Sequence, residues 1–568
     1  MKLPDHCLQH QFRTLTEALL AAPQERPFIT DWIDEDEIHT VTFGEFTRTA
    51  RLRAEALRKL GVKFGEIVIL VMPQGISLMA SFAGAMLLGA IPTILAYPSF
   101  KVDAAKYKSG LIGVSRNLQA GLVVVDDDFP AELITHVSAS ERVQVVRTGE
   151  MSIEVGDADF ADITNQPEGL AFIQHSAGTT GLQKGVALTH RAVLTQINHL
   201  AEAIAITPED RIYSWLPLYH DMGLIACFML PLVYHVPVIM QSPLGWVVRP
   251  GTMLELISSY RCTLSWVPNF ALQFLARRVR PEDRSRYELS SLRALINCSE
   301  PVRAASMDEF IAAYEPHGLD RNALKSSYAM AENVFGVTQS EITDSPRRIW
   351  VDGRRLNQTS VAVTVSSTAA HAVWFVSSGR CLSGNRVRVV SPNGKDLSDY
   401  EVGEIVIQSD SLFDGYYNRP ELSAAVCIDG WYRTGDLGFR ANGELYVTGR
   451  KKDLIIVAGN NIYPQDIEEI VSRHPAIHDG RVVAFGLYNE ERGTEDIIVA
   501  AELENGVVVD IKEVERNIRD AIVAELDVVP RAVFLKPPAW IVKSTAGKPA
   551  RSTTRDKLLH EHLDLACS

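Results

Sequence analysis

The distribution of apolar positions along the chain changes about two-thirds of the way through. In the earlier part, apolar runs alternate with segments of helical periodicity, for example at residues 66–72, 76–88, 121–125 and 143–146. Runs such as GLVVV and VPVIM are apolar at every position, as expected for strands that are buried on both faces of a sheet. This alternation predicts βαβ units in which helices cover parallel sheets.

After about residue 380 the apolar runs become short and alternating. NRVRVVSPNG, GEIVIQSD and GELYVTGR end in Gly or Asn turns, which predicts a small antiparallel, barrel-like part over about residues 380–449. Further on, IYPQDIEEIVSRH predicts a helix with Pro464 in its first turn, and IKEVERNIRDAIVAEL predicts an amphipathic helix. VVAFGLY and DIIVAAEL predict strands of the same region.

A chain of 568 residues is too long for one hydrophobic core, so we expect at least two domains. The fold class that we predict is α/β. A large N-terminal domain of two helix-covered sheets plus the barrel-like part is expected over residues 1–451. A small, mobile α+β domain is expected over residues 452–568, with the boundary at Lys452.

Two apolar stretches have lengths that suit a membrane helix. Residues 67–97 contain no charge, but a Pro-Gln-Gly turn at 73–75 and Pro92 interrupt them, which leaves residues 76–90 too short to span. Two prolines interrupt the second stretch, residues 222–240. We expect both stretches to be buried core, and we expect no membrane span.

Composition excludes some classes of function. The net charge is −14 and the isoelectric point is about 5.6, which argues against binding a nucleic acid polymer but leaves nucleotide binding open. The seven cysteines are scattered, with no metal-knuckle spacing, and are interpreted as reduced thiols. The N-terminus has no apolar signal core. We therefore expect a cytoplasmic protein.

The segment HSAGTTGLQKG carries the strongest local signal. A predicted strand, GLAFIQ, precedes it, and VALTHRAVL, a predicted strand and helix, follows it. Its glycines let the backbone curl around an anion, and its hydroxyls, N–H groups and Lys184 can donate to phosphate oxygens. It is not a P-loop, because Gln183 precedes Lys184 and Gly185 follows it. A phosphate loop and a plain polar hairpin both stay open on this segment alone.

SAGTTGLQKG resembles the glycine-rich loop of the superfamily that contains acyl-CoA synthetases, nonribosomal peptide adenylation domains and firefly luciferase. Ala177 and Gln183 stand where a serine and a proline are usual. The resemblance implies that ATP and Mg²⁺ are used to convert a carboxylic acid into an acyl-adenylate and pyrophosphate, before the acyl group passes to a thiol. It also implies that Thr180 is among the catalytic residues. The residues that it implies contact the nucleotide are Ser176, Gly178, Thr179, Thr180, Gly181 and Lys184.

Further motifs follow in the order that is usual in this superfamily. YAMAE is similar to Tyr-Gly-x-Thr/Ala-Glu, which implies that Tyr328 packs against adenine and that the catalytic Glu332 helps to bind magnesium. Ala329 replaces the usual glycine. GWYRTGDLG is similar to a motif whose aspartate, here Asp436, accepts hydrogen bonds from both ribose hydroxyls.

The last two motifs resemble the hinge and the catalytic-lysine segment of the superfamily. GRKKDLIIVAGNNIYPQDIE implies that Arg450 contacts the ribose or α-phosphate region, that Lys452 is the hinge, and that Gly459 lies in a loop that reaches the pantetheine tunnel after rotation. KSTAGKPAR implies that Lys548 is the catalytic lysine between the carboxylate and the α-phosphate, and Lys543 is the alternative. Without the resemblance, this stretch would be interpreted as a solvated basic tail.

Finer features resemble one branch, the fatty acyl-AMP ligases. SWLPLYHDMGLI is similar to their Trp-Leu-Pro-x-x-His-Asp-Met-Gly-Leu signature, and VPNFAL and the Ser-Glu-Pro-Val run also match. Two alternatives stay open: His220 is either an acyl-site residue or an ordinary core histidine, and residues 223–233 either line an acyl tunnel or belong to the ordinary core. The match implies acyl-site roles for His220, Asn269 and Met330, and nucleotide contacts for Ser299 and Glu300.

Spacing supports the same branch, because Gly379 lies 47 residues after Glu332, further than is typical of CoA synthetases. The surplus predicts an inserted segment at about residues 342–374, which in fatty acyl-AMP ligases packs against the large domain and hinders rotation. The resemblance implies acyl transfer to the phosphopantetheine thiol of an acyl carrier protein, often for polyketide or lipopeptide biosynthesis. Asp410-Ser411-Leu412 mimics a carrier attachment site but lies in the barrel-like part, so we expect a separate carrier.

Two alternatives stay open. The nearer one is an acyl-CoA synthetase, which differs only in using coenzyme A as acceptor. The more distant one is a non-catalytic adenylate-binding module, against which the presence of Lys548, Glu332 and Asp436 argues.

Overall fold

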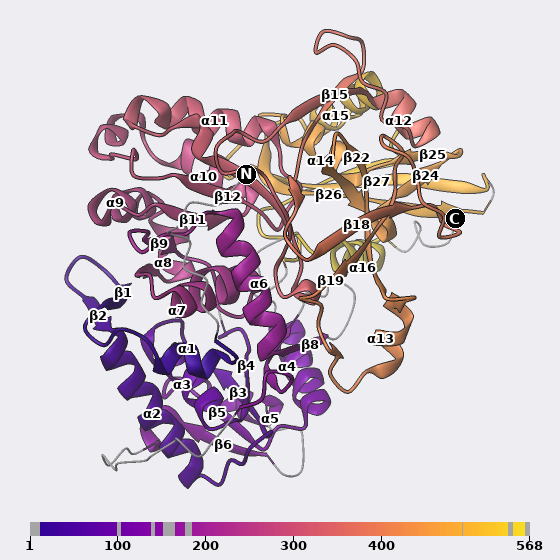
Figure 1. The fold of residues 1–568 in the computed structure, drawn as a ribbon. Coiled ribbons are helices and arrows are strands. Elements are labelled where there is room, and N and C mark those ends of the chain that lie inside the picture. The colour runs from indigo at the N-terminus through magenta and orange to yellow at the C-terminus, as the bar shows by residue number, and fades with distance from the viewer. Residues whose placement is uncertain are drawn as a thin grey trace.

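The structure is a computed structural model, which describes residues 12–98, 104–137, 143–151, 165–175, 184–490, 492–543 and 549–562. Figure 1 shows the N-terminal two-thirds of the chain, indigo to pink, as a column of sheets and helices, with the orange and yellow C-terminal third beside its upper end. The predicted α/β class is confirmed, with both parallel and antiparallel sheets.

A four-stranded parallel sheet forms the lower part of the column. Its order is β4-β3-β5-β6, and α3 (Ile76–Leu87) connects β3 to β4 and packs against α2 (Phe43–Lys59). A Cβ atom on Gly84 of α3 would lie 2.6 Å from the Ala50 carbonyl oxygen of α2, so only glycine permits this close approach. The strands are β3 (Ile67–Val71), β4 (Ile91–Ile94), β5 (Leu122–Val125) and β6 (Gln144–Arg147). The predicted βαβ units are present.

A nine-stranded sheet forms the middle of the column. Its central strands run parallel, whereas the edge strands β2 and β17, and β14 next to β17, pair antiparallel with their neighbours. In sheet order the strands are β17 (Arg380–Cys381), β14 (Gly336–Gln339), β13 (Leu324–Ala329), β12 (Ala294–Asn297), β11 (Leu264–Val267), β9 (Ile212–Ser214), β10 (Val238–Gln241), β1 (Pro27–Trp32) and β2 (Ile38–Thr42).

The structure adds a third, smaller sheet of order β20-β8-β7 next to β4. β7 (Leu170–His175) and β8 (Gly185–Thr189) flank the glycine-rich segment, and β20 (Gly415–Tyr416) pairs with β8 from far along the chain. The Thr189 hydroxyl caps the following helix, α6 (His190–Ala203), by accepting from the Ala192 N–H. The predicted strand before the glycine-rich segment and the predicted strand and helix after it are therefore present.

The remaining helices of the large part lie between and around these sheets. They are α1 (Leu15–Leu20), α4 (Ala104–Leu118), α5 (Ile134–Val137), α7 (Leu230–Tyr234), α8 (Pro243–Val248), α9 (Gly251–Tyr260), α10 (Asn269–Arg278), α11 (Ala304–Tyr314) and α13 (Pro420–Val426).

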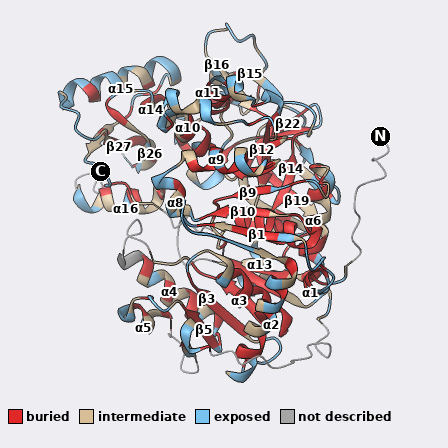
Figure 2. Ribbon diagram, turned by 90° about the vertical axis from the view of Figure 1, so that its left-hand side faces the viewer, coloured by how far each residue is buried: buried red, intermediate tan, exposed pale blue. Residues whose placement is uncertain are grey.

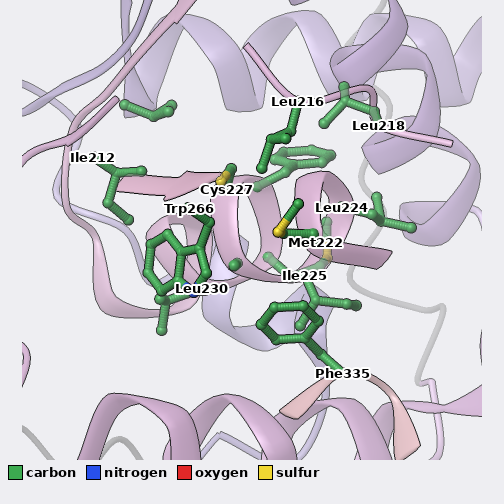
Figure 3. Packing of buried hydrophobic residues seen from close by; sticks show 14 of the residues in the cluster. Ile212, Leu216, Leu218, Met222, Leu224, Ile225, Cys227, Leu230, Trp266 and Phe335 are labelled. Atoms are coloured by element: carbon green, nitrogen blue, oxygen red, sulfur yellow. The ribbon is translucent and has the colours of Figure 1, made fainter. Parts of the chain in front are cut away.

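The core passes through the middle of the molecule, where Figure 2 shows mostly buried strands and helices. A π-helix, Met222–Met229, is buried at every position and packs with neighbours such as Trp266 and Phe335 (Figure 3). Neither predicted core stretch spans a membrane, because no helix among the described residues is long and apolar enough. The five described cysteines form no disulfide.

The predicted barrel-like part is an antiparallel sheet of order β18-β19-β22-β21, and β23 pairs with β22 along the same edge as β21. Ser411 follows β19 and is fully buried, so the Asp-Ser-Leu triplet is not an accessible attachment site. The strands are β18 (Asn385–Val390), β19 (Gly403–Ser409), β21 (Cys427–Ile428), β22 (Trp431–Ala441) and β23 (Glu444–Arg450).

The predicted insert is a hairpin of β15 (Arg348–Asp352) and β16 (Ala372–Val376) around α12 (Gly353–Thr359). The Trp350 and Trp374 rings stack with their centroids 5.0 Å apart. The insert shares an apolar cluster with β22 and β23, and this cluster also includes Tyr463 from beyond Lys452. The insert therefore contacts both the large part and the chain that follows the predicted hinge.

The chain after Lys452, which we call the C-terminal part, has its own apolar cluster between residues 455 and 533. Pro464 occupies the first turn of α14, as predicted. The elements are β24 (Ile455–Val457), β25 (Asn460–Ile462), α14 (Pro464–Ser472), β26 (Ile477–Asn489), β27 (Thr494–Leu503), α15 (Ile511–Leu526), β28 (Ala532–Lys536) and α16 (Arg551–Glu561).

Candidate active site

Three residues from separate motifs meet where the ends of β13 and β23 adjoin the middle of β22. The Tyr328 hydroxyl donates to Asp436 Oδ2 at 2.6 Å, and Arg450 Nε lies 3.3 Å from Asp436 Oδ1. Asp436 and Arg450 are direct partners in the antiparallel register of β22 and β23. The sheet therefore holds both oxygens of this carboxylate between a phenol and a guanidinium group.

Burial dominates the electrostatics of this cluster. It raises the pKa of Asp436, and the Arg450 charge opposes that shift. The pKa of Tyr328 is also raised, first by burial and then by the Asp436 carboxylate. Each additional hydrogen-bond donor stabilises the ionised form of a carboxylate that is largely buried, and the two hydroxyls of a ligand diol would supply two such donors.

A second group of polar side chains surrounds Tyr416. Its hydroxyl donates to Glu332 Oε1 at 2.8 Å and lies 3.3 Å from the Tyr432 hydroxyl. Lys184 Nζ, on the strand side of the glycine-rich segment, lies 4.4 Å from the centroid of the Tyr416 ring. Glu332 follows β13 directly, in a short 3₁₀ turn, so it is only four residues from Tyr328. The two groups therefore adjoin one another.

Tyr416 and Tyr432 were not among the predicted site residues. Tyr432 lies inside the GWYRTGDLG motif, so the sequence contained a signal for it. Tyr416 reaches Glu332 only because β20 pairs with β8, and no local pattern indicates that pairing.

The Glu332 carboxylate suits a magnesium ion that is held mainly by phosphates. No group of three or more His, Cys, Asp or Glu side chains within the described ranges could hold a metal by itself. Mg²⁺ usually binds through one or two carboxylates together with substrate phosphates, and Tyr416 occupies only one Glu332 oxygen through its hydrogen bond. The chemistry of this site therefore fits the predicted ion.

Lys452 lies in a 3₁₀ turn, Lys451–Asp453, directly after β23. Its pKa is lowered by burial and then by the Arg450 charge, with Lys184 also contributing, whereas Asp453 and Asp436 raise it. The predicted hinge residue is thus close to both groups described above. Lys184, Arg450 and Lys452 together provide a positive field, which favours a polyphosphate.

On the predicted acyl side, His220 and Asp221 stand at the N-terminal end of the buried π-helix. His220 Nδ1 lies 2.6 Å from Asp221 Oδ1, and both side chains are largely buried. Asn269 is tied into the scaffold, since its Oδ1 accepts from Asn297 Nδ2 at 2.9 Å and from the Arg303 N–H at 3.0 Å. Polar groups of this region are therefore engaged with protein partners.

The loop after β12 carries Ser299 and Glu300 towards this region. Ser299 has a φ of +68°, a left-handed conformation that is uncommon for residues other than glycine and that favours a functional constraint. Glu300 Oε2 accepts from the N–H of Phe270, the residue that follows Asn269. Met330 is half-buried, and its N–H donates to the Phe335 carbonyl oxygen at 2.8 Å. Glu300, whose motif assigns it to the nucleotide, therefore contacts the residue next to the acyl-site candidate Asn269, and the roles of Ser299, Glu300 and Met330 stay predictions.

Six predicted residues cannot be placed. Lys543 and Pro549 form an isolated antiparallel bridge at the two ends of the segment that contains the catalytic-lysine candidate. The residues that lie outside the described ranges are Ser176, Gly178, Thr179, Thr180, Gly181 and Lys548.

Comparisons with known proteins agree with this geometry. Residues 16–417 match the family described as AMP-binding enzyme. The chain is 32% identical over 548 residues to "Medium-chain-fatty-acid--[acyl-carrier-protein] ligase JamA" of Moorena producens, covering 93% of this chain and 92% of that protein. It is 30% identical over 573 residues to "Long-chain-fatty-acid--AMP ligase FadD32" of Mycolicibacterium smegmatis, covering 91% and 88%.

A solved structure from a study of fatty acyl-adenylate ligases of E. coli and L. pneumophila superposes with a TM-score of 0.89. It covers 99% of this chain and 100% of its own, at 26% identity. The chain therefore belongs to the AMP-binding enzyme family. Within that family it is an enzyme of the ligase type.

Proposed function

We propose that this chain is a cytoplasmic fatty acyl-AMP ligase. It activates a fatty or related carboxylic acid with ATP, releases pyrophosphate, and transfers the acyl group to the phosphopantetheine thiol of a separate acyl carrier protein. The observation that supports this most strongly is the contact of Tyr328, Asp436 and Arg450, three residues from three motifs that the superfamily uses for one nucleotide. The names of the two curated relatives support the choice of acid and acceptor.

In the first half-reaction, Asp436 accepts hydrogen bonds from the ribose hydroxyls while Tyr328 packs against adenine. An oxygen of the acid attacks the α-phosphorus in line, an O–P bond forms, and the P–O bond to pyrophosphate breaks. Magnesium, when bound at Glu332, supplies positive charge to the polyphosphate. Thr179, Thr180, Lys184 and Lys548 donate to the oxygens on which negative charge develops, and Arg450 adds charge beside the α-phosphate.

In the second half-reaction, the C-terminal domain, residues 452–568, turns about Lys452 and withdraws Lys548. The carrier thiol then attacks the acyl carbonyl carbon, a thioester forms, and AMP leaves with the electrons of the broken C–O bond. Gly459 lies on the hairpin that would face the arriving pantetheine arm. The hinge position at Lys452 is supported by its place between β23 and the separate apolar cluster of the C-terminal part.

The inserted segment helps to distinguish carrier protein from coenzyme A as the thiol acceptor. The insert reaches the C-terminal part directly, because Asn461 Nδ2 donates to Ser360 Oγ at 3.0 Å. An inserted segment of this kind is a feature of the fatty acyl-AMP ligases, so its presence favours carrier protein over coenzyme A as the acceptor. Acyl-CoA synthetase activity is the second candidate.

The experiment is an ATP–pyrophosphate exchange screen across carboxylic acids of different chain length, followed by an acceptor test. The purified enzyme is offered holo-carrier protein, apo-carrier protein or coenzyme A. We expect exchange with at least one fatty acid and transfer to the holo-carrier alone. Exchange with no acid would contradict adenylate formation, and transfer to coenzyme A at equal rate would favour the second candidate.

A further inference from the structure

Arg303 joins the acyl-side loop to the C-terminal part. It directly precedes α11, and its backbone N–H donates to Asn269 Oδ1 at 3.0 Å. Its guanidinium Nη2 donates to the Gln465 carbonyl oxygen at 2.9 Å, and Nη1 forms an ion pair with Glu469. Both partners belong to α14, beyond the proposed hinge. One residue therefore contacts the predicted acyl site through its backbone and the C-terminal part through its side chain.

The Arg303–Glu469 pair is the most protected of the ion pairs that cross this boundary in the described structure. Its side chains are 26% and 29% exposed, compared with 48% and 39% for Arg277–Asp479 and 47% and 68% for Arg354–Asp527. Exposed ion pairs contribute little, whereas removing one partner of a protected, hydrogen-bonded pair costs much more. Arg303 thus makes the most protected of these ion pairs between the two parts.

Of the other two acidic residues of α14, Asp466 also interacts with the charge of Arg303, whereas Glu468 is bound by a different residue. Glu468 is held by Arg551 at 2.7 Å, and the same guanidinium contacts Asp453, next to Lys452, at 2.7 Å. Arg551 begins α16, so this contact ties α16 to α14 and to the turn that contains Lys452. The hairpin that carries Gly459 is instead tied to the insert through Asn461. We call this placement of the C-terminal part, in which Arg303 binds α14 and Asn461 binds the insert, the docked arrangement.

We propose that Arg303 is a positioning residue that holds the C-terminal part in the docked arrangement for acyl-AMP formation and releases Gln465 and Glu469 before acyl transfer. The inference rests on the proposed two-step function. It gives the Ser-Glu-Pro-Val-Arg run a role beyond lining the site, because Arg303, the last residue of this run, links the acyl-side loop to the C-terminal part.

The test measures the two half-reactions separately in Arg303→Met, which keeps the backbone donor and an apolar side chain of similar length. We expect exchange to fall about 10-fold, because the docked arrangement is less populated. Single-turnover transfer from preformed, enzyme-bound acyl-AMP to the holo-carrier is expected to stay equal or to rise. Arg277→Met removes an exposed pair across the same boundary and is the matched control, with less than a 2-fold change expected in either step.

A readout that does not depend on activity is limited digestion with trypsin, which cuts after Lys451 and Lys452. Arg303→Met should increase cleavage at these two lysines several-fold, and Glu469→Gln, which changes the other side of the contact, should do the same. The double variant should be no more sensitive than either single variant, since both remove one contact. Additive effects, unchanged cleavage, or an equal loss in both half-reactions would overturn the proposal.

These outcomes are distinct from failure of the proposed function. If the unaltered enzyme exchanges pyrophosphate with no acid, the function is wrong and the digestion test still decides the role of Arg303. If the unaltered enzyme is active and Arg303→Met keeps full exchange and normal digestion, only the positioning role is wrong.

Discussion

The nucleotide side and the acyl side of the site are built in opposite ways. On the nucleotide side, charged and phenolic groups meet directly, as in the contacts of Asp436 with Tyr328 and Arg450. On the acyl side, the π-helix Met222–Met229 is packed into continuous apolar core, and its polar neighbours are tied to the scaffold. The difference indicates that adenylate formation depends on a few polar contacts. The choice among acids would instead depend on how the apolar side chains around the π-helix pack.

The largest effect is expected on the nucleotide side. Lys548→Ala should lower ATP–pyrophosphate exchange about 100- to 1000-fold, because it removes a donor aimed at the charge that develops in the transition state. Lys543→Ala, five residues away, is the control and should change exchange less than 3-fold. A larger loss in the control would mean that the catalytic lysine is misassigned.

The next effect concerns Asp436. Asp436→Asn keeps the size of the side chain but removes the charge that accepts the ribose hydroxyls, so we expect the KM for ATP to rise about 10- to 100-fold. The KM for the acid should change little. Asp410→Asn, an exposed aspartate after β19, is the matched control. An unchanged KM for ATP would contradict the ribose contact.

The acyl side is tested by Met222→Ala in the π-helix. If this residue is ordinary core, the substitution lowers the free energy of unfolding by about 2–4 kcal/mol and leaves the preference among acids unchanged. If it lines an acyl tunnel, the preferred chain lengthens with a smaller loss of stability. Denaturant unfolding and the exchange screen together separate the two, and we expect a shift in chain length.

A smaller effect is expected from Tyr416→Phe, which removes the hydroxyl that donates to Glu332. A hydrogen bond to a charged acceptor contributes about 1.5 kcal/mol or more, so exchange at limiting Mg²⁺ should fall about 10-fold and recover in part at high Mg²⁺. Tyr417→Phe, at the next position, is the control. A loss that magnesium does not relieve would assign Tyr416 to packing instead.

The smallest effect concerns Asp466 on α14. Burial raises its pKa to about 6, Arg303 opposes the shift, and Glu468 adds to it. The folded state therefore favours the protonated form of Asp466. The free energy of unfolding falls as the pH rises from about 4, near the ordinary pKa of an aspartate, through about 6, the pKa in the folded state. Asp466→Asn should raise the melting temperature by about 1–2 °C at pH 7.5, with the gain disappearing by pH 4. The charged and titratable groups around this carboxylate also include Arg354, His371 and Glu525.

Much of the fold could be predicted from local pattern. The order of β3, α3 and β4, the antiparallel strands after residue 380, and α14 with Pro464 in its first turn all follow from apolar periodicity and turn residues. The placement of Asp436 beside Arg450 follows from two motifs on adjacent strands. Pattern succeeds here because the contacts lie within one strand, one helix or one hairpin.

What the sequence did not reveal depends on distant pairing. Tyr416 meets Glu332 only through the third sheet, and Arg303 meets Glu469 only when the C-terminal part is docked. The Trp215 and Trp246 rings, stacked 3.8 Å apart, come from different elements and shape the core near the acyl side. No spacing rule in a single chain indicates such contacts, because they depend on how elements pack.

The pairing of β20 with β8 also has a consequence for how the enzyme is made. Tyr416 lies opposite Val186, and the Tyr417 N–H donates to the Gly185 carbonyl oxygen at 2.7 Å, so the outer edge of β8 is paired by residues made more than two hundred codons later. During translation, one edge of β8 therefore stays unpaired until β20 leaves the ribosome. Contacts of such long sequence separation form slowly and expose intermediates to aggregation, so shortened chains that end before residue 415 should need chaperones to stay in solution.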